Sequence, residues 1–361
     1  MSVKFNDLIW YGRTLDNEGI RYFDYSSSGF AFVMKGKKAA ATFLSDPEKH
    51  AETNKGVIGV FVTEGTDLSW KSMPEEPTVR IIFDKDVNEC VLFESDVEKT
   101  VTVRVVKISE DAFGCAGLKD LQIEGELAPF DKLRDRTDGH LKLEFIGDSI
   151  TCGYGIEGVW EKDTFTTTQQ RADKSYAFLT AKKLNAEIQC CSWSGIGIIS
   201  NYVDPETAKI PETSWLMPAN WPYTDKSLSL RLGLEPEVWD ESRYSPDIVV
   251  INLGTNDTSW VHGNEDRRLA YVSGLRQLIE AVHRRSPKAK ICGCLGVMGQ
   301  ELCDSMKEAL DLFHKDFPSV PVKYVKFPVQ DAADGIGADW HPSAKTHQKM
   351  AEQLAGELKN W

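Results

Sequence analysis

The stretch KLEFIGDS, Lys142–Ser149, has the pattern of a short buried strand that runs directly into a Gly-Asp-Ser turn. Four more apolar runs of similar length follow, at 187–192, 247–253, 290–295 and 322–325. Helical patterns lie between and after them, at 173–184, 266–285, 302–317 and 343–358. Short buried runs that alternate with amphipathic helices are typical of a parallel sheet covered on both faces. We therefore predict a three-layer α/β domain with a parallel sheet.

Residues 1–135 have a different pattern. Short apolar or alternating runs are broken by turn residues and show no helical period between them, at 29–34, 56–62, 78–83 and 99–106. This pattern predicts a β-sandwich. Because a polar stretch at 131–140 separates the two patterns, we expect two domains, at 1–135 and 140–361. Residues 200–245 show no clear period, and we expect them to form a long insertion near the rim of the parallel sheet.

The charge balance limits the partners that the chain can have. Its 361 residues include 42 Lys or Arg and 55 Asp or Glu, which gives a formal net charge of −13. Nucleic-acid phosphates and anionic membranes repel such a chain, so we expect neither as a partner. No run approaches the ~20 apolar residues of a membrane-spanning helix, and the start at Met1 has no signal-peptide run. We expect a cytoplasmic protein, or a secreted one if a signal has been removed.

The eight cysteines predict neither disulfides nor a metal site. Two pairs, Cys190 with Cys191 and Cys292 with Cys294, lie in apolar runs where cysteine packs as a small hydrophobic residue. Neither pair has further Cys or His residues at the spacing of metal ligands. We therefore expect reduced thiols and no bound metal.

Three polar motifs follow strands of the predicted parallel sheet. They are Gly147-Asp148-Ser149, Gly254-Thr255-Asn256-Asp257 and Gly337-Ala338-Asp339-Trp340-His341-Pro342. Each motif by itself also suits an ordinary helix cap or turn. Ligands of open α/β sheets bind at the carboxyl ends of the strands, and the motifs come in the order nucleophile, polar donor, base. This order favours a catalytic interpretation.

Acyl transfer requires these residue types. A serine hydroxyl becomes a nucleophile when a histidine removes its proton, and an acceptor on the other ring nitrogen sets the histidine tautomer. Ser149, His341 and Asp339 can fill these three roles. The developing oxyanion needs donors in place beforehand. The main-chain amides of Ser149 and Gly195 and the side-chain amide of Asn256 are the candidates, although Gly195 also suits a simple turn.

The four blocks resemble those of the SGNH hydrolases, the GDSL-type esterases. Within that group, FIGDSITCGYG at 145–155 and Asp339-Trp340-His341-Pro342 resemble carbohydrate esterase family 2. Short fragments of the N-terminal part, Tyr11-Gly12-Arg13 and Ser28-Gly29-Phe30, resemble the same family.

The resemblance implies a jelly-roll domain packed on an SGNH α/β domain, the removal of O-acetyl groups from polysaccharides such as xylan or mannan, and no cofactor. It also implies that Ser149 is the nucleophile, His341 the base, and Gly195 and Asn256 oxyanion donors. In the wider superfamily the Asp stands three residues before the His, where this chain has Ala338. Asp339 stands two before it, so the partner of His341 is either this carboxylate or a main-chain carbonyl.

Tryptophans near these motifs are candidates for stacking on a sugar ring. Trp260 lies four residues after Asn256, and Trp340 precedes His341. Core packing explains any single tryptophan equally well, because tryptophan is highly buried on average. We expect His347 to pack in the core, because it lies on the apolar face of the last helix.

Three functions remain open from the sequence. The first is an esterase that removes acetyl groups from acetylated oligosaccharides or polysaccharides. The second is a lipase or thioesterase that uses the same chemistry on another acyl group. The third is a carbohydrate-binding protein without catalysis. The glycan, the preferred hydroxyl and the oligomeric state leave no pattern in the sequence.

Overall fold

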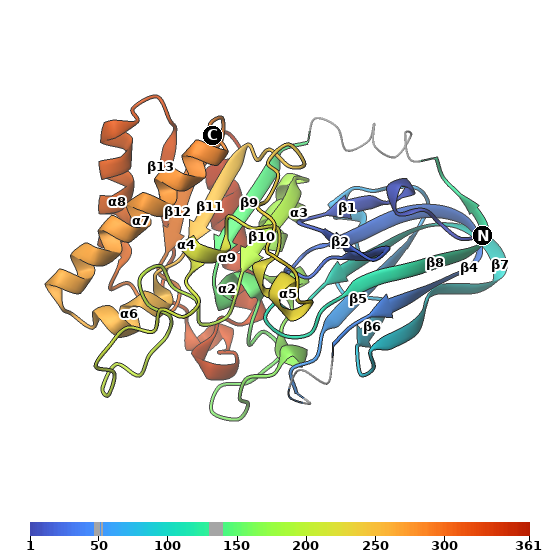
Figure 1. Ribbon diagram of the computed structural model, residues 1–361, viewed down its shortest axis with the longest axis horizontal. Coiled ribbons are helices and arrows are strands. Elements are labelled where there is room, and N and C mark those ends of the chain that lie inside the picture. Colours follow the sequence, from blue (N-terminus) through green and yellow to red (C-terminus); the bar gives the residue numbers. More distant parts are fainter. Residues whose placement is uncertain (47–50, 52, 130–139) are drawn as a thin grey trace.

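Two β-sheets lie side by side in the computed structural model, which describes residues 1–46, 51, 53–129 and 140–361 (Figure 1). The antiparallel sheet precedes the parallel one in the chain. The predicted boundary at 135–140 lies outside the described residues except for His140. Among the described helices, none combines the length and the apolar character that a bilayer-spanning segment needs.

The N-terminal sheet is antiparallel and curls around its own core, as in a jelly roll. Its strands are β1 (Ile9–Tyr11), β2 (Leu15–Asn17), β3 (Ile20–Tyr22), β4 (Gly29–Leu44), β5 (Val57–Glu64), β6 (Val79–Ile82), β7 (Val87–Lys107) and β8 (Gly117–Leu127). They pair in the order β2-β3-β8-β4-β7-β5-β6, and β1 pairs with the start of β4. The register of β4 shifts after Gly36 against both neighbours. Such a shift bends a strand and increases the local twist, which helps the sheet to curl.

The sequence pattern predicts only parts of the strands of this sheet. The predicted runs at 29–34 and 99–106 are the first part of β4 and the last part of β7. The first half of β7 is largely exposed, and its one apolar run, Cys90-Val91-Leu92-Phe93, is followed by the mostly polar stretch 94–100, so the sequence pattern does not reveal the full strand. The strand exists because its main chain pairs with β4 over nearly the whole length of β4.

The C-terminal sheet is parallel, as predicted. Its strands are β9 (Lys142–Gly147), β10 (Glu187–Ser192), β11 (Ile248–Asn252), β12 (Lys290–Leu295) and β13 (Val322–Lys326), in the order β10-β9-β11-β12-β13. The long helices are α3 (Tyr176–Leu184), α7 (Glu265–Arg285), α8 (Cys303–Asp316) and α9 (Ala344–Leu358). The short ones are α2 (Ser149–Cys152), α4 (Met217–Asn220), α5 (Lys226–Arg231) and α6 (Thr255–Val261). Single 3-10 turns are η1 (Phe5–Asp7), η3 (Trp70–Ser72), η4 (Thr167–Gln169), η5 (Ala172–Lys174), η6 (Ala332–Asp334) and η7 (Ala338–Trp340).

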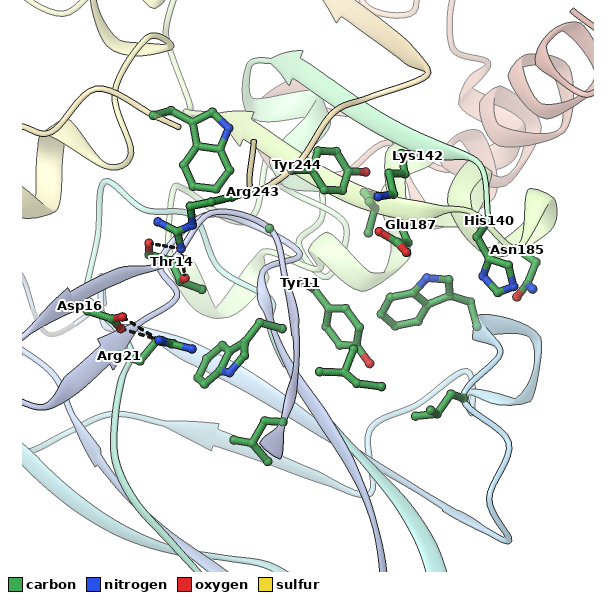
Figure 2. A pocket seen from close by; sticks show the side chains of 18 residues that line it. Tyr11, Thr14, Asp16, Arg21, His140, Lys142, Asn185, Glu187, Arg243 and Tyr244 are labelled. Atoms are coloured by element: carbon green, nitrogen blue, oxygen red, sulfur yellow. Dashed lines mark hydrogen bonds and ion pairs between the residues drawn. The ribbon is translucent and has the colours of Figure 1, made fainter. Parts of the chain in front are cut away.

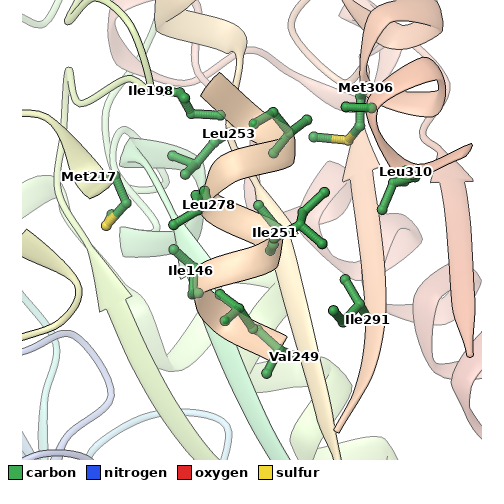
Figure 3. Packing of buried hydrophobic residues seen from close by; sticks show 14 of the residues in the cluster. Ile146, Ile198, Met217, Val249, Ile251, Leu253, Leu278, Ile291, Met306 and Leu310 are labelled. Carbon is green, nitrogen blue, oxygen red and sulfur yellow. The ribbon is translucent and has the colours of Figure 1, made fainter. Parts of the chain in front are cut away.

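Helices cover both faces of this sheet. Side chains alternate along each strand, so Val249 and Ile251 of β11 face α7 and α8, whereas Ile248 and Val250 face α3 and α9. Figure 3 shows the first of these layers, in which Ile251 packs near Leu278 of α7. The central strands β11 and β12 are therefore buried on both faces, which explains why they appear as apolar runs in the sequence.

A buried ion pair joins the two sheets. Arg13 follows β1, and its guanidinium lies 2.9 Å from the carboxylate of Glu144 on β9. The indole nitrogen of Trp221 donates to the same carboxylate over 3.1 Å. Trp221 belongs to the segment 200–245, which contains α4 and α5 and buries Trp221 and Met217 in the core. This segment therefore packs along the contact between the two sheets.

Candidate active site

Ser149 lies at the carboxyl end of β9, as the first residue of α2. Asp148 is the only residue between the end of β9 and the start of α2. Its carboxylate accepts a hydrogen bond from the main-chain nitrogen of Ile150 over 3.0 Å and so caps the helix. A side chain at Gly147 would collide with Thr151, because a Cβ there would lie 2.0 Å from its hydroxyl oxygen. The sharp turn therefore needs glycine and a capping carboxylate, and it directs Ser149 to the edge of the sheet.

The Ser149 hydroxyl lies 2.8 Å from Nε2 of His341. His341 comes from the loop before α9, so 192 positions of sequence separate the two side chains. A hydroxyl at this distance from an imidazole nitrogen has the geometry of a nucleophile and its general base.

Two main-chain carbonyls hold the other nitrogen of His341. Nδ1 lies 3.1 Å from the carbonyl oxygen of Ala338 and 3.1 Å from that of Asp339. These oxygens can only accept, so the ring proton resides on Nδ1 and Nε2 is left to accept from Ser149. Burial lowers the pKa of His341 to about 4, so the ring is neutral at pH 7.

The carboxylate of Asp339 points elsewhere. It accepts a hydrogen bond from the hydroxyl of Tyr154 over 2.5 Å, and the Tyr154 ring packs edge-on against the ring of His341. Asp339 and Trp340 both have left-handed main-chain angles, with φ of 48° and 64°. The sequence left two partners open for His341, and the structure places the carbonyl oxygens there and not the Asp339 side chain.

The three predicted oxyanion donors follow three neighbouring strands. Ser149 follows β9, Gly195 follows β10 and Asn256 follows β11. Gly195 has φ of 77°, and an added Cβ would meet no atom within 4 Å, so this side of the loop is open. The side-chain amide of Asn256 donates one bond to the carbonyl of Ile196 over 2.8 Å. An amide has a second N–H, which remains available to a ligand.

A buried aspartate holds the loop after β10 to α6. The carboxylate of Asp257 accepts from the main-chain nitrogens of Ile198, Ile199 and Ser200 over 3.0, 2.7 and 3.2 Å. Burial raises the pKa of Asp257 to about 6, and these three donors oppose that shift. The loop that carries Gly195 and the helix α6 that carries Asn256 are therefore fixed to each other before any ligand binds.

Sequence reasoning missed Glu110. This fully buried side chain follows β7 of the antiparallel sheet and accepts from the main-chain nitrogen of Ser194, next to Gly195, over 2.5 Å. It also lies 3.3 Å from the sulfur of Cys152 at the end of α2. No motif near Glu110 signals these contacts, because the residue lies in the segment after β7, far in sequence from the motifs of the parallel sheet.

The two tryptophan candidates differ in exposure. Trp340 is 41% exposed and meets Trp160, itself 39% exposed, edge to face at a centroid distance of 5.3 Å. One face of Trp260 is covered, because the guanidinium of Arg267 lies 3.6 Å from its ring centroid. Trp340 is next to His341 in the chain, so the exposed aromatic pair lies beside the contact between Ser149 and His341.

His347 packs in the core, as predicted. It is fully buried on α9, and its Nδ1 accepts from the main-chain nitrogen of Tyr176 over 3.0 Å. Burial lowers the pKa of His347 to about 3, so it is neutral and takes no part in the pair formed by Ser149 and His341.

A separate pocket lies at the opposite end of the parallel strands. It has a volume of about 520 Å³ and is bordered by Tyr11 of β1, Lys142 at the start of β9 and Glu187 at the start of β10. In Figure 2, Lys142 and Glu187 lie on one side of the Tyr11 ring. Ser149 lies beyond the other end of β9, so this pocket is distinct from the candidate active site.

Three buried carboxylates, of Asp24, Asp111 and Asp225, have oxygen atoms within 4.8 Å of one another. Cations of the chain already lie among them. The guanidinium of Arg231 is 2.6 Å from Asp24 and 3.2 Å from Asp111, and the ammonium of Lys107 is 3.3 Å from Asp24. This cluster therefore forms ion pairs with Arg231 and Lys107 at the contact between the two sheets.

Comparison with known proteins relates this geometry to a family. Residues 145–349 match the profile of the GDSL-like Lipase/Acylhydrolase family. Cellulase/esterase CelE of Acetivibrio thermocellus is 40% identical over 224 residues, which are 61% of this chain and 25% of CelE. An acetylxylan esterase / glucomannan deacetylase of Cellvibrio japonicus is 26% identical over 351 residues, 96% of this chain and 87% of that protein. This chain therefore spans a quarter of CelE and most of the Cellvibrio protein.

Solved structures agree over the whole length. A family two carbohydrate esterase from Clostridium thermocellum, solved in complex with cellohexaose, superposes with a TM-score of 0.81 at 30% identity and covers 98% of both chains. The acetyl xylan esterase Est2A from Butyrivibrio proteoclasticus superposes with a TM-score of 0.84 at 20% identity, over 100% of this chain and 97% of that one. At 20% identity the match to Est2A shows a shared fold. At 30% identity the match to the Clostridium enzyme also shows that the two sequences belong to one family.

Proposed function

The chain belongs to the GDSL-like lipase/acylhydrolase family and, within it, to the family 2 carbohydrate esterases, and from this premise we propose that it removes O-acetyl groups from xylan- or mannan-type glycans. The single observation that carries the chemistry is the 2.8 Å contact between the Ser149 hydroxyl and Nε2 of a neutral His341. The acyl group would pass through an ester of Ser149.

The first half of the proposed reaction forms the acyl-serine. His341 takes the proton of Ser149 as its oxygen attacks the acetyl carbonyl, and the carbonyl electrons move onto the oxygen. The main-chain amides of Ser149 and Gly195 and the side chain of Asn256 would donate to this oxyanion. As the intermediate collapses, the bond to the sugar oxygen breaks and His341 returns the proton to that oxygen.

The second half releases acetate. A water molecule gives a proton to His341 and attacks the acetyl-serine, and collapse of this intermediate returns the proton to Ser149. In both halves His341 becomes an imidazolium for a short time. The carbonyl oxygens of Ala338 and Asp339 face the Nδ1 proton and stabilise this charge through their dipoles.

The sugar part of the proposal is supported by the exposed rings of Trp160 and Trp340 and by the relatives. An apolar face of a pyranose can pack on an exposed indole, while its hydroxyls remain in water. Relatives that cover most of this chain are named as an acetylxylan esterase / glucomannan deacetylase and as a carbohydrate esterase in complex with cellohexaose. These observations favour a glycan over a fatty-acyl ester, which needs a long apolar channel.

Acetate release from acetylated xylan and mannan oligosaccharides tests the proposal, with the released positions assigned by NMR. Wild type should release acetate, and Ser149→Ala should lower the rate by about 10⁴-fold or more. Ser286→Ala is a matched control, because Ser286 is 5% exposed like Ser149 and its hydroxyl has no hydrogen-bond partner among the described residues. The control should keep the wild-type rate.

A chain-length series separates the alternatives. If butyryl and octanoyl esters were cleaved faster than acetyl esters, the enzyme would be a lipase or thioesterase and the glycan assignment would be wrong. If the chain bound glycans and hydrolysed no ester, it would be a binding protein and the catalytic assignment would fail.

A further inference from the structure

Glu110 connects the antiparallel sheet to two segments of the parallel-sheet domain, namely the loop after β10 that carries Gly195 and the helix α2 that begins with Ser149. We call these two segments the catalytic loops. Glu110 lies three residues after β7 and is completely buried. Its Oε2 atom accepts from the main-chain nitrogen of Ser194 over 2.5 Å and from the Cys152 thiol over 3.3 Å. The first contact touches the residue before Gly195, and the second touches the last residue of the helical turn that begins with Ser149.

The second oxygen of Glu110 is held by Gln170. The side-chain nitrogen of Gln170 donates to Oε1 over 2.9 Å, and the main-chain nitrogen of Glu110 donates to the side-chain oxygen of Gln170 over 2.8 Å. This reciprocal pair fixes the plane of the carboxylate. The carboxylate in turn presents Oε2 to the two loops in one orientation.

We propose that Glu110 is a positioning residue that sets the spacing between the Ser149 nucleophile and the Gly195 oxyanion donor. The inference rests on the proposed esterase function and extends it by giving the antiparallel sheet a part in catalysis. Glu110 does not contact the reacting atoms, and it acts through Ser194 and Cys152.

The chemistry of the site requires a group that only accepts. Ser194 N–H and the Gln170 amide present hydrogens to Glu110, and the single hydrogen of the Cys152 thiol has Glu110 and the Ser192 hydroxyl as acceptors, both at 3.3 Å. Burial raises the pKa of Glu110, and the hydrogen bonds from Ser194 and Gln170 oppose this shift because they favour the ionised carboxylate. That carboxylate can accept all of these hydrogens, whereas a carboxamide has one oxygen and one NH₂ group. In Glu110→Gln the oxygen can serve Ser194, but then the NH₂ group faces the NH₂ group of Gln170. A donor placed against a donor in a buried site forces the side chains apart.

The position of an oxyanion donor matters because it must match the transition state. A displacement of about 1 Å can cost 10²-fold in rate, although the substrate still binds. Glu110→Gln should therefore lower kcat for acetate release roughly 10- to 100-fold and leave KM within about twofold. A role in folding alone would lower the melting temperature and leave kcat per folded molecule unchanged.

Exchange of the two side chains gives the sharpest test. In the double variant Glu110→Gln/Gln170→Glu, the carboxylate at position 170 accepts from both the side chain and the main-chain nitrogen of position 110. The amide oxygen of the new side chain at position 110 then faces Ser194 again. We expect the double variant to recover at least half of the loss in log kcat. If Glu110→Gln lowers kcat about 100-fold, the double variant should be at most about tenfold below wild type, with no change in KM.

Glu144→Gln is the matched control. Glu144 is another fully buried glutamate between the two sheets, and it accepts from Arg13, Gln189 and Trp221 without touching either catalytic loop. The Glu144→Gln variant should be less stable than wild type, and the kcat of its folded fraction should be unchanged. Thermal unfolding of every variant gives the folded fraction to which kcat is referred.

The outcomes separate this inference from the proposed function. If wild type releases acetate and Glu110→Gln keeps its kcat, or if the exchange fails to restore activity to a folded double variant, the positioning role is wrong while the esterase assignment stands. If wild type releases acetate from no glycan but cleaves other esters, the same variants measured on those esters still decide the role of Glu110.

Discussion

The hydroxyl of Tyr154 donates a hydrogen bond to the carboxylate of Asp339 over 2.5 Å, and this contact turns the carboxylate away from His341. The histidine is left with the carbonyl oxygens of Ala338 and Asp339 as acceptors. The side chain of Asp339 therefore supports the loop, and the main chain of the same residue orients the ring of His341.

Asp339→Asn should keep activity within about tenfold of wild type. Where an aspartate side chain orients the histidine of a Ser-His-Asp triad, the same substitution costs about 10⁴-fold. Here an asparagine can still accept from Tyr154, and the carbonyls that hold His341 are unchanged. Steady-state kinetics on an aryl acetate checks this, and a loss of 10³-fold or more would show that the carboxylate itself assists His341.

Asn256→Ala should lower kcat by roughly 10²- to 10³-fold with little change in KM, because it removes one donor to the oxyanion. Its remaining contact is with the carbonyl of Ile196, so the fold should survive. Asn264→Ala serves as the control, since Asn264 caps α7 and its loss should cost only about 1 kcal/mol of stability. Equal activities of the two variants would argue against an oxyanion role for Asn256.

The pH profile of kcat/KM should have its acid limb near pH 4. His341 must be neutral to accept the Ser149 proton, and burial lowers its pKa to about 4. The ring is therefore protonated, and activity lost, only as the pH falls through about 4, not through the ordinary histidine value of about 6.5. Circular dichroism at each pH separates titration from unfolding. A limb at 6.5 in folded enzyme would contradict this environment for His341.

Trp340→Ala should raise KM for acetylated oligosaccharides about 3- to 10-fold, the range expected for one aromatic contact, and should not change kinetics on a small aryl acetate. Trp260→Ala is the comparison, because Arg267 already covers one face of that ring. We expect a smaller effect on KM from Trp260→Ala. The reverse order would place the sugar over α6 instead of over the Trp160 and Trp340 pair.

Arg13→Met should lower the free energy of unfolding by about 3–5 kcal/mol, because it leaves the buried carboxylate of Glu144 without its cation. Urea denaturation measures the loss. The double variant Arg13→Met/Glu144→Gln removes the stranded charge and should recover part of it. A single-variant loss below about 1 kcal/mol would show that the ion pair contributes little to joining the sheets.

The strands of the parallel sheet could be predicted well from the sequence, whereas for the antiparallel sheet the class could be predicted but only parts of its strands. β9 to β12 lie between two helical layers and are almost wholly buried, so their sequences are mostly apolar and stand out from the helices. The first half of β7 is largely exposed, and only its pairing with β4 makes it a strand. Pairing between distant segments leaves little trace in local composition.

The candidate site shows the same division. Ser149, Gly195 and Asn256 could be proposed together because each follows a parallel strand, and parallel strands place their carboxyl ends at one edge. Glu110 could not be proposed, because it reaches the site from the other sheet. The exposure of Trp340 and the covered face of Trp260 also depend on contacts that sequence spacing does not contain.

Patterns and motifs in the sequence were enough to predict the two-sheet architecture, the family and the set of polar residues that follow the strands of the parallel sheet. These follow from periodicity and from short motifs, which are local properties of the chain. Which acceptor holds His341, and how Glu110 joins the segments that carry Ser149 and Gly195, became visible only in the folded chain. Both depend on main-chain angles at single residues and on the packing of one sheet against the other, and neither is a local property.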